Sequence, residues 1–183
     1  MALKATIFKA DLQISDMNRH YYHTHSLTVA QHPSETDERV MVRLLAFACH
    51  ADEALTFTKG IAEADEPDLW HKDLTGVIKL WIEIGQPDER RILKACGRSE
   101  QVVIYTYSSH SDIWWKQLSS KLARVKNLTV MNLPERLSKQ LAALAQRSMQ
   151  LQCTIQEEQI WFSNGNETLQ IEFETLQMPA NKN

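Results

Sequence analysis

The chain has 183 residues, 43% of them hydrophobic, and one domain of this size can bury a substantial core. Its formal net charge of -3 excludes a molecule that is basic throughout, so a nucleic acid partner would need a local basic face. The three cysteines lack metal-finger spacing and suit reduced thiols. Because no apolar run approaches the roughly 20 residues of a membrane helix, and no signal-peptide core is present, we expect a cytoplasmic protein without a membrane partner.

Two segments near the N-terminus predict a β-hairpin. Residues 5–16 and 21–31 alternate between apolar and polar positions, and a turn lies between them. The second segment carries His23 and His25 on one face. Hydrogen-bonded or exposed histidines are favoured there over a metal site, because no third ligand is evident.

Residues 35–51 predict a helix with an apolar stripe. Ser34 and Asp37 resemble a capping box at its start. Glu38 is in register with the stripe, which predicts a place at the N-terminal end of the buried face. The commoner explanation for an acid at this place is its favourable interaction with the helix dipole.

The densest apolar run, residues 77–86, predicts a central strand covered by helices. It follows a short strand over 55–61, an acidic loop from Glu63 to Glu66 and the segment 67–71. Glu83 lies near the end of the central strand, where burying an unpaired carboxylate would be costly. We therefore expect a cation, a hydrogen-bond network or a metal ion beside it.

Pro87 to Gly97 predict the next helix, which begins with acidic residues. Its polar side carries four basic residues, Arg90, Arg91, Lys94 and Arg98. Such a face is usually only solvated, but its spacing also suits contact with the phosphates of a nucleic acid.

The C-terminal half alternates strands and helices. We expect strands over 102–108, 128–133, 149–161 and 167–175, helices over 111–124 and 135–146, and a polar tail from about residue 178. Trp114 and Trp115 cannot share one helix face, which predicts one tryptophan in the core and one as a surface or ligand contact. The pattern indicates a single domain of the α/β (α+β) class, with a mixed central sheet flanked by helices and added antiparallel hairpins.

Three segments resemble the bacterial YaeQ family: Pro67-Asp68-Leu69-Trp70, then Leu80 to Pro87, then Arg91 to Gly97. The likeness runs essentially the full length of the chain. It implies a variant of the restriction-endonuclease-like PD-(D/E)XK fold, whose core runs helix, three strands, helix, strand. The predicted segments from residue 35 to 108 follow this order.

The resemblance also implies a site. Asp68 and Glu83 occupy the places of the two metal-binding acids, and Glu38 that of an acid on the first helix. Gly85 stands where a lysine is usual, which nominates Lys94 on the following helix, and Gln86 would orient a ligand. Such a site would use Mg²⁺, or Mn²⁺, for phosphodiester hydrolysis. The alternative is a non-catalytic module that binds nucleic acid or protein on the same scaffold.

Overall fold

The computed structural model describes residues 4–179, which form two compact units, each built around its own sheet. The first unit contains the chain up to Ala51 together with Arg136–Glu172, and the second contains Asp52–Glu135 with the residues from Phe173 onward. Both sheets are mixed, and four α-helices accompany them in the described part of the chain. The α/β class is therefore confirmed, with two sheets in place of one central sheet.

The sheet of the first unit has the strand order β10-β9-β8-β1-β2, in which β1 and β8 are parallel and the other neighbours are antiparallel. The unit's elements are β1 (Thr6–Asp16), β2 (Tyr21–Gln31), α1 (Asp37–Cys49), α4 (Glu135–Ala142), β8 (Ser148–Gln156), β9 (Gln159–Ser163) and β10 (Thr168–Ile171). Strand β1 alternates buried and more exposed residues, because one face packs into the core. The predicted N-terminal hairpin is confirmed.

Helix α1 begins two residues later than predicted. Its cap is Thr36, whose hydroxyl accepts a hydrogen bond from the Arg39 amide at 3.2 Å, so the proposed cap of Ser34 and Asp37 is wrong. Glu35 and Arg43 form a buried ion pair at 2.6 Å beside this turn. Arg43 also donates to the Ala30 carbonyl at 3.0 Å, which ties the helix to β2.

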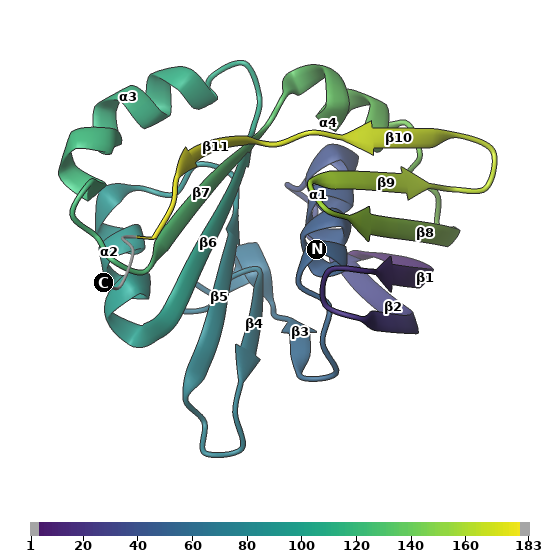
Figure 1. The fold of residues 1–183 in the computed structure, drawn as a ribbon, viewed down its shortest axis with the longest axis horizontal. Helices are drawn as coiled ribbons and strands as arrows, with labels where there is room; N and C mark the ends of the chain where they lie inside the picture. The colour runs from purple at the N-terminus through teal and green to yellow at the C-terminus, as the bar shows by residue number, and fades with distance from the viewer. Residues whose placement is uncertain (1–3, 180–183) are drawn as a thin grey trace. The chain divides into compact units, whose positions relative to one another are not determined.

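The sheet of the second unit has the order β11-β7-β6-β5-β4-β3. Strands β5, β6 and β7 are parallel, and the remaining neighbours are antiparallel (Figure 1). The elements are β3 (Leu55–Phe57), the 3₁₀ turn η1 (Gly60–Ala62), β4 (Leu69–Lys72), β5 (Ile78–Ile84), α2 (Glu89–Arg98), β6 (Ser99–Tyr107), α3 (Ser111–Leu122), β7 (Leu128–Leu133) and β11 (Glu174–Gln177).

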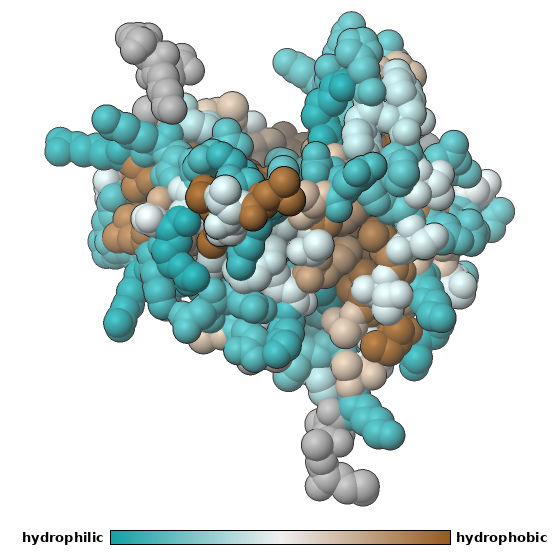
Figure 2. All heavy atoms as spheres, turned by 90° about the horizontal axis from the view of Figure 1, so that it is seen from below, coloured by the Kyte–Doolittle hydropathy of each residue, from teal (hydrophilic) through white to brown (hydrophobic). Residues whose placement is uncertain are grey.

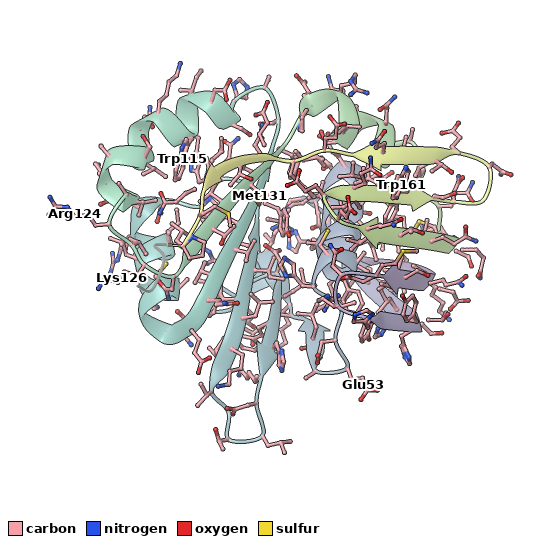
Figure 3. All side chains as sticks on the ribbon, in the orientation of Figure 1. Glu53, Trp115, Arg124, Lys126, Met131 and Trp161 are labelled. Atoms are coloured by element: carbon pink, nitrogen blue, oxygen red, sulfur yellow. The ribbon has the colours of Figure 1, made fainter. Side chains whose placement is uncertain are left out.

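The core of this second unit lies between the parallel strands and helices α2 and α3. Trp81, Ile104 and Val130 from three neighbouring strands pack there with the apolar faces of both helices. Trp114 and Trp115 are both partly buried against this core, and the Trp114 indole donates to the Pro87 carbonyl at 2.9 Å. The predicted division into one core and one surface tryptophan is not found, because both side chains are partly buried; Figure 3 labels Trp115 on α3.

Several boundaries differ from the predictions. Residues 149–161 form parts of two strands, because the chain turns at Glu157, whose φ is 55°. Strand β3 ends at Phe57, before the 3₁₀ turn. Of the predicted polar tail, residues 180–183 lie outside the described residues.

The surface carries mixed side chains. In the face shown in Figure 2, hydrophilic residues predominate, and hydrophobic residues form smaller groups between them. Within residues 4–179, no helix combines the length and apolar character needed to cross a membrane.

Candidate functional site

Asp68 and Glu83 lie side by side in the second unit. Leu69 of β4 pairs with Ile82 of β5, which places the preceding Asp68 opposite Glu83. The Asp68 amide donates to the Ile82 carbonyl at 3.0 Å, and its Oδ2 accepts from the Ile84 amide at 2.8 Å. Asp68 therefore binds the residues on both sides of Glu83. Both carboxylates are buried, at 2% and 4% exposure.

Two donors meet one oxygen of Glu83. Its Oε1 accepts from the indole Nε1 of Trp81 and from the guanidinium Nε of Arg91, each at 2.9 Å. Burial raises the pKa of Glu83, and the nearby charge of Asp68 raises it further, while Arg91 and the hydrogen bonds from Trp81 and Arg91 lower it; the net shift is upward. In the described residues, no hydrogen-bond donor contacts Glu83 Oε2.

Arg91 links the carboxylate pair to the acidic loop. Besides Glu83, it donates from Nη1 to the Ala64 carbonyl at 2.6 Å and from Nη2 to the Glu66 carbonyl at 2.7 Å. Its side chain is 30% exposed, whereas that of Glu83 is 5% exposed. The guanidinium thus uses both its charge and its fork of donors to hold a main-chain loop beside a buried acid.

Gly60 makes room for Asp68 from the start of the 3₁₀ turn. Its φ is 55°, in the left-handed region, and a Cβ added to it would lie 3.4 Å from Asp68 Oδ1. Nearby, Thr58 donates its hydroxyl to the Pro67 carbonyl and its amide to the Asp68 carbonyl. These contacts fix the segment that leads into Asp68.

The other basic residues of α2 contact the acidic loop or face solvent. Lys94 Nζ lies 2.6 Å from Asp65 Oδ1, with the lysine side chain 58% exposed, and Arg98 donates to the Asp65 carbonyl at 3.1 Å. The Lys94 hydrogen bond and charge lower the pKa of Asp65. Arg90 is exposed. The four residues predicted as a nucleic-acid face thus include three that hold the chain itself.

The structure brings together only part of the predicted site. Asp68 and Glu83 are adjacent, but the cation bound to Glu83 is Arg91, and Lys94 contacts Asp65 instead. Gln86 donates to Ser108 Oγ at 3.0 Å at the carboxyl end of β5. Glu38 belongs to the first unit, where its Oε1 accepts from Ser138 Oγ at 2.6 Å.

Sequence reasoning missed two partners of Glu83. Trp81 stands two residues earlier in the same strand, so its side chain shares a face with Glu83, and this period-two spacing was a usable signal. Arg91 and Lys94 lie three residues apart on one helix face, and the spacing alone does not distinguish them.

In the part of the chain that the structure describes, no three His, Cys, Asp or Glu side chains are grouped to hold a metal ion.

The structure thus defines a mixed α/β protein with a buried carboxylate pair beside the parallel strands of its second unit. The model of the family described as YaeQ protein matches residues 1–173, and the chain belongs to the YaeQ family. The uncharacterized protein YaeQ of Escherichia coli (strain K12) is 45% identical over 181 residues, which cover 98% of this chain and 100% of that protein. The uncharacterized protein YaeQ of Salmonella typhi is 46% identical with the same coverage.

Two solved structures share the fold. The crystal structure of YaeQ protein from Xanthomonas axonopodis pv. citri has a TM-score of 0.91 and 46% identity, and the alignment covers 96% of this chain and 99% of that one. The crystal structure of YaeQ protein from Pseudomonas syringae also has a TM-score of 0.91, with 31% identity and coverage of 95% and 97%.

Proposed function

We propose that this protein is a metal-dependent phosphodiesterase of the PD-(D/E)XK nuclease type, in which Asp68 and Glu83 bind Mg²⁺. The observation that supports the proposal is the adjacency of these two buried carboxylates on neighbouring strands. The order of elements α1, β3, β4, β5, α2 and β6 also follows the helix, three strands, helix, strand of that fold. Strand adjacency of two acids, where burial opposes both charges, is typical of a site that binds a cation.

The two carboxylates suit Mg²⁺ or Mn²⁺ better than they suit a metal ion whose ligands all come from the protein. Mg²⁺ commonly binds through one or two carboxylates, with water and substrate phosphate as its other ligands. Asp68 and Glu83 Oε2 would supply the protein's share. When bound, the metal would polarise the phosphoryl group and lower the pKa of a coordinated water.

Arg91 takes the part that we assigned to a lysine. It holds Glu83 in one orientation, and a guanidinium at this place can stabilise the negative charge that develops on a phosphate. Lys94 supports the acidic loop through Asp65. At Gly85, the usual lysine position, φ is 110° and no heavy atom lies within 4 Å of an added Cβ, which leaves open space near Gln86.

Metal-dependent thermal unfolding and cleavage assays test the proposal together. Millimolar Mn²⁺ or Mg²⁺ should raise the Tm of the wild type by mass action, and should raise it less for Asp68→Asn and Glu83→Gln. Cleavage of DNA or RNA should require the metal and be lost in both variants. Glu100→Gln is a matched control, because Glu100 is exposed and pairs with Lys79 at 2.7 Å. An equal Tm response in all proteins, or none in the wild type, would contradict a two-carboxylate metal site.

The second candidate is a module that binds nucleic acid or an acidic protein surface without hydrolysis. It is favoured by the ion pair of Arg91, which already compensates Glu83, and by Gly85 at the lysine position. Its ligand would meet the exposed Arg90, Lys94 and Arg98. Salt-sensitive binding that continues without cleavage across DNA and RNA substrates, in Mg²⁺ and in Mn²⁺, would support this alternative.

A further inference from the structure

The four sheet edges of this protein differ greatly in length. Strands β3, β10 and β11 are edges of 3, 4 and 4 residues, and β11 also has a register shift. The fourth edge, β2, has 11 residues. Short strands and irregular registers are common means by which proteins prevent edge-to-edge pairing. Strand β2 uses neither of them.

Strand β2 also lacks the other protective features of an edge. Its sequence from Tyr21 to Gln31 contains no Lys, Arg, Asp, Glu or Pro, and all 11 residues pair with β1 in one continuous register. Tyrosine, threonine, valine and histidine give it a sequence suited to extended pairing. Only Val29 is fully buried, and Leu27 on the same face is only partly covered. The strand therefore resembles an interior strand that has a partner on one side only.

The hydrogen-bond pattern shows which main-chain groups lie on the open side. The Lys9 amide donates toward β8, to the Arg147 carbonyl at 2.8 Å, so the odd residues of β1 point to β8 and the even ones to β2. The register then directs the odd residues of β2 toward β1 and its even residues outward. Ala30 agrees with this assignment, because its carbonyl accepts from Arg43. Tyr22, Thr24, Ser26 and Thr28 are the even residues that remain along the edge.

We propose that β2 pairs with β2 of a second copy of this chain, antiparallel about a two-fold axis at His25. The four outward residues are symmetric about that position, so Thr24 would face Ser26 and Tyr22 would face Thr28 of the second copy. Every outward residue gains a main-chain partner, and all four bear hydroxyl groups that suit cross-strand contact. Since β2 carries no Lys, Arg, Asp or Glu, none of these charges meets its like across the axis.

A second copy fits better than an unrelated peptide, because the interface is self-complementary and a two-fold axis uses the same surface twice. The pairing would join two five-stranded sheets into one continuous sheet. His25 would lie at the axis; its ring is hydrogen-bonded to the Tyr21 hydroxyl at 2.7 Å and packs edge-on against Phe47 with centroids 5.0 Å apart. Both contacts tie the side chain at the centre of the strand to its own monomer.

Sedimentation velocity over a range of concentrations tests the association. The mass should rise from 21.1 kDa toward twice that value as concentration increases. Thr24→Lys should weaken the association at least about tenfold, because it sets two cations close to the axis. Thr24 is exposed, so the folded monomer should tolerate the change. Gln170→Lys, an exposed position on the opposite edge strand β10, should leave the association unchanged.

Amide exchange on the wild-type protein tests the register without any variant. In the associated state, the amides of Tyr22, Thr24, Ser26 and Thr28 should exchange more slowly than in dilute protein, whereas the amides that point to β1 should be protected in both. A mass of 21.1 kDa at every concentration would overturn the proposal. A dimer whose four outward amides still exchange as in the monomer would overturn it as well.

Discussion

Replacing Arg91 by methionine removes the only basic side chain bound to Glu83 in the described residues. Removing one partner of a buried ion pair costs about 3–5 kcal/mol, because a charge is left buried without compensation. Arg91 is 30% exposed, so water can replace part of its contribution. Two hydrogen bonds to the loop carbonyls are also lost, each contributing about 1 kcal/mol. We expect Arg91→Met to lower the free energy of unfolding by about 3 kcal/mol at pH 7.

The loss should depend on pH in a defined direction. The pKa of Glu83 is already raised from 4.5 in the native protein, and losing Arg91 raises it further. Between pH 4.5 and its raised native pKa, Glu83 holds a proton in the native state that the unfolded state has released. The free energy of unfolding therefore falls as pH rises through this range and is regained as pH falls toward 4.5. Urea unfolding at a series of pH values should therefore show a smaller difference between variant and wild type at pH 5 than at pH 7.

A double variant and a control separate this effect from loss of packing. Adding Glu83→Gln to Arg91→Met removes the buried charge and should restore much of the lost stability. Arg90→Met, on the exposed side of α2, should change the stability by no more than about 0.5 kcal/mol. A pH-independent loss in Arg91→Met, with no recovery in the double variant, would refute the idea that Arg91 acts mainly by compensating Glu83.

Two further substitutions, one in each unit, can be tested by urea unfolding. Gly60→Ala should destabilise the second unit by about 1–2 kcal/mol, because its φ is left-handed and its new Cβ would lie 3.4 Å from Asp68; an unchanged midpoint would contradict this. Arg43→Met should cost about 3–5 kcal/mol by removing the more deeply buried of the partners Arg39 and Arg43 from the buried Glu35, and a loss below about 1 kcal/mol would show that Arg39 alone compensates it.

Local sequence patterns predicted the elements whose residues alternate or carry clear end signals. Strand β7 coincides with its predicted range, and strands β1 and β2 of the hairpin each lie within one residue of their own predicted ranges. The break between β8 and β9 was missed, because Glu157 and Glu158 are not typical turn residues, and Glu157 adopts a positive φ nonetheless. The start of β6 at Ser99 was also missed: its polar residues look like a loop, but their pairing with β5 makes them a strand.

The candidate site was predictable where it depends on strand pairing. Asp68 and Glu83 flank a turn between neighbouring antiparallel strands, and such pairing brings residues from opposite sides of the turn together. The cation was not predictable, because the choice between Arg91 and Lys94 depends on where helix α2 begins and on the position of the acidic loop. The N-cap of helix α2 is Asp88, whose side chain accepts a hydrogen bond from the Arg91 amide at 2.8 Å, which places Arg91 in the first turn of the helix.

The charge of the site distinguishes the two candidate functions. By formal charge, Asp68 and Glu83 contribute two negative charges and Arg91 one positive charge, a net charge of -1 for the cluster. Such a cluster repels a phosphodiester, and one bound divalent cation would change its net charge to +1 and reverse that repulsion. Binding of nucleic acid at this site should therefore require the metal. A module that uses the exposed basic residues of α2 should instead bind without metal, and Mg²⁺ should weaken that binding by competing for the phosphates.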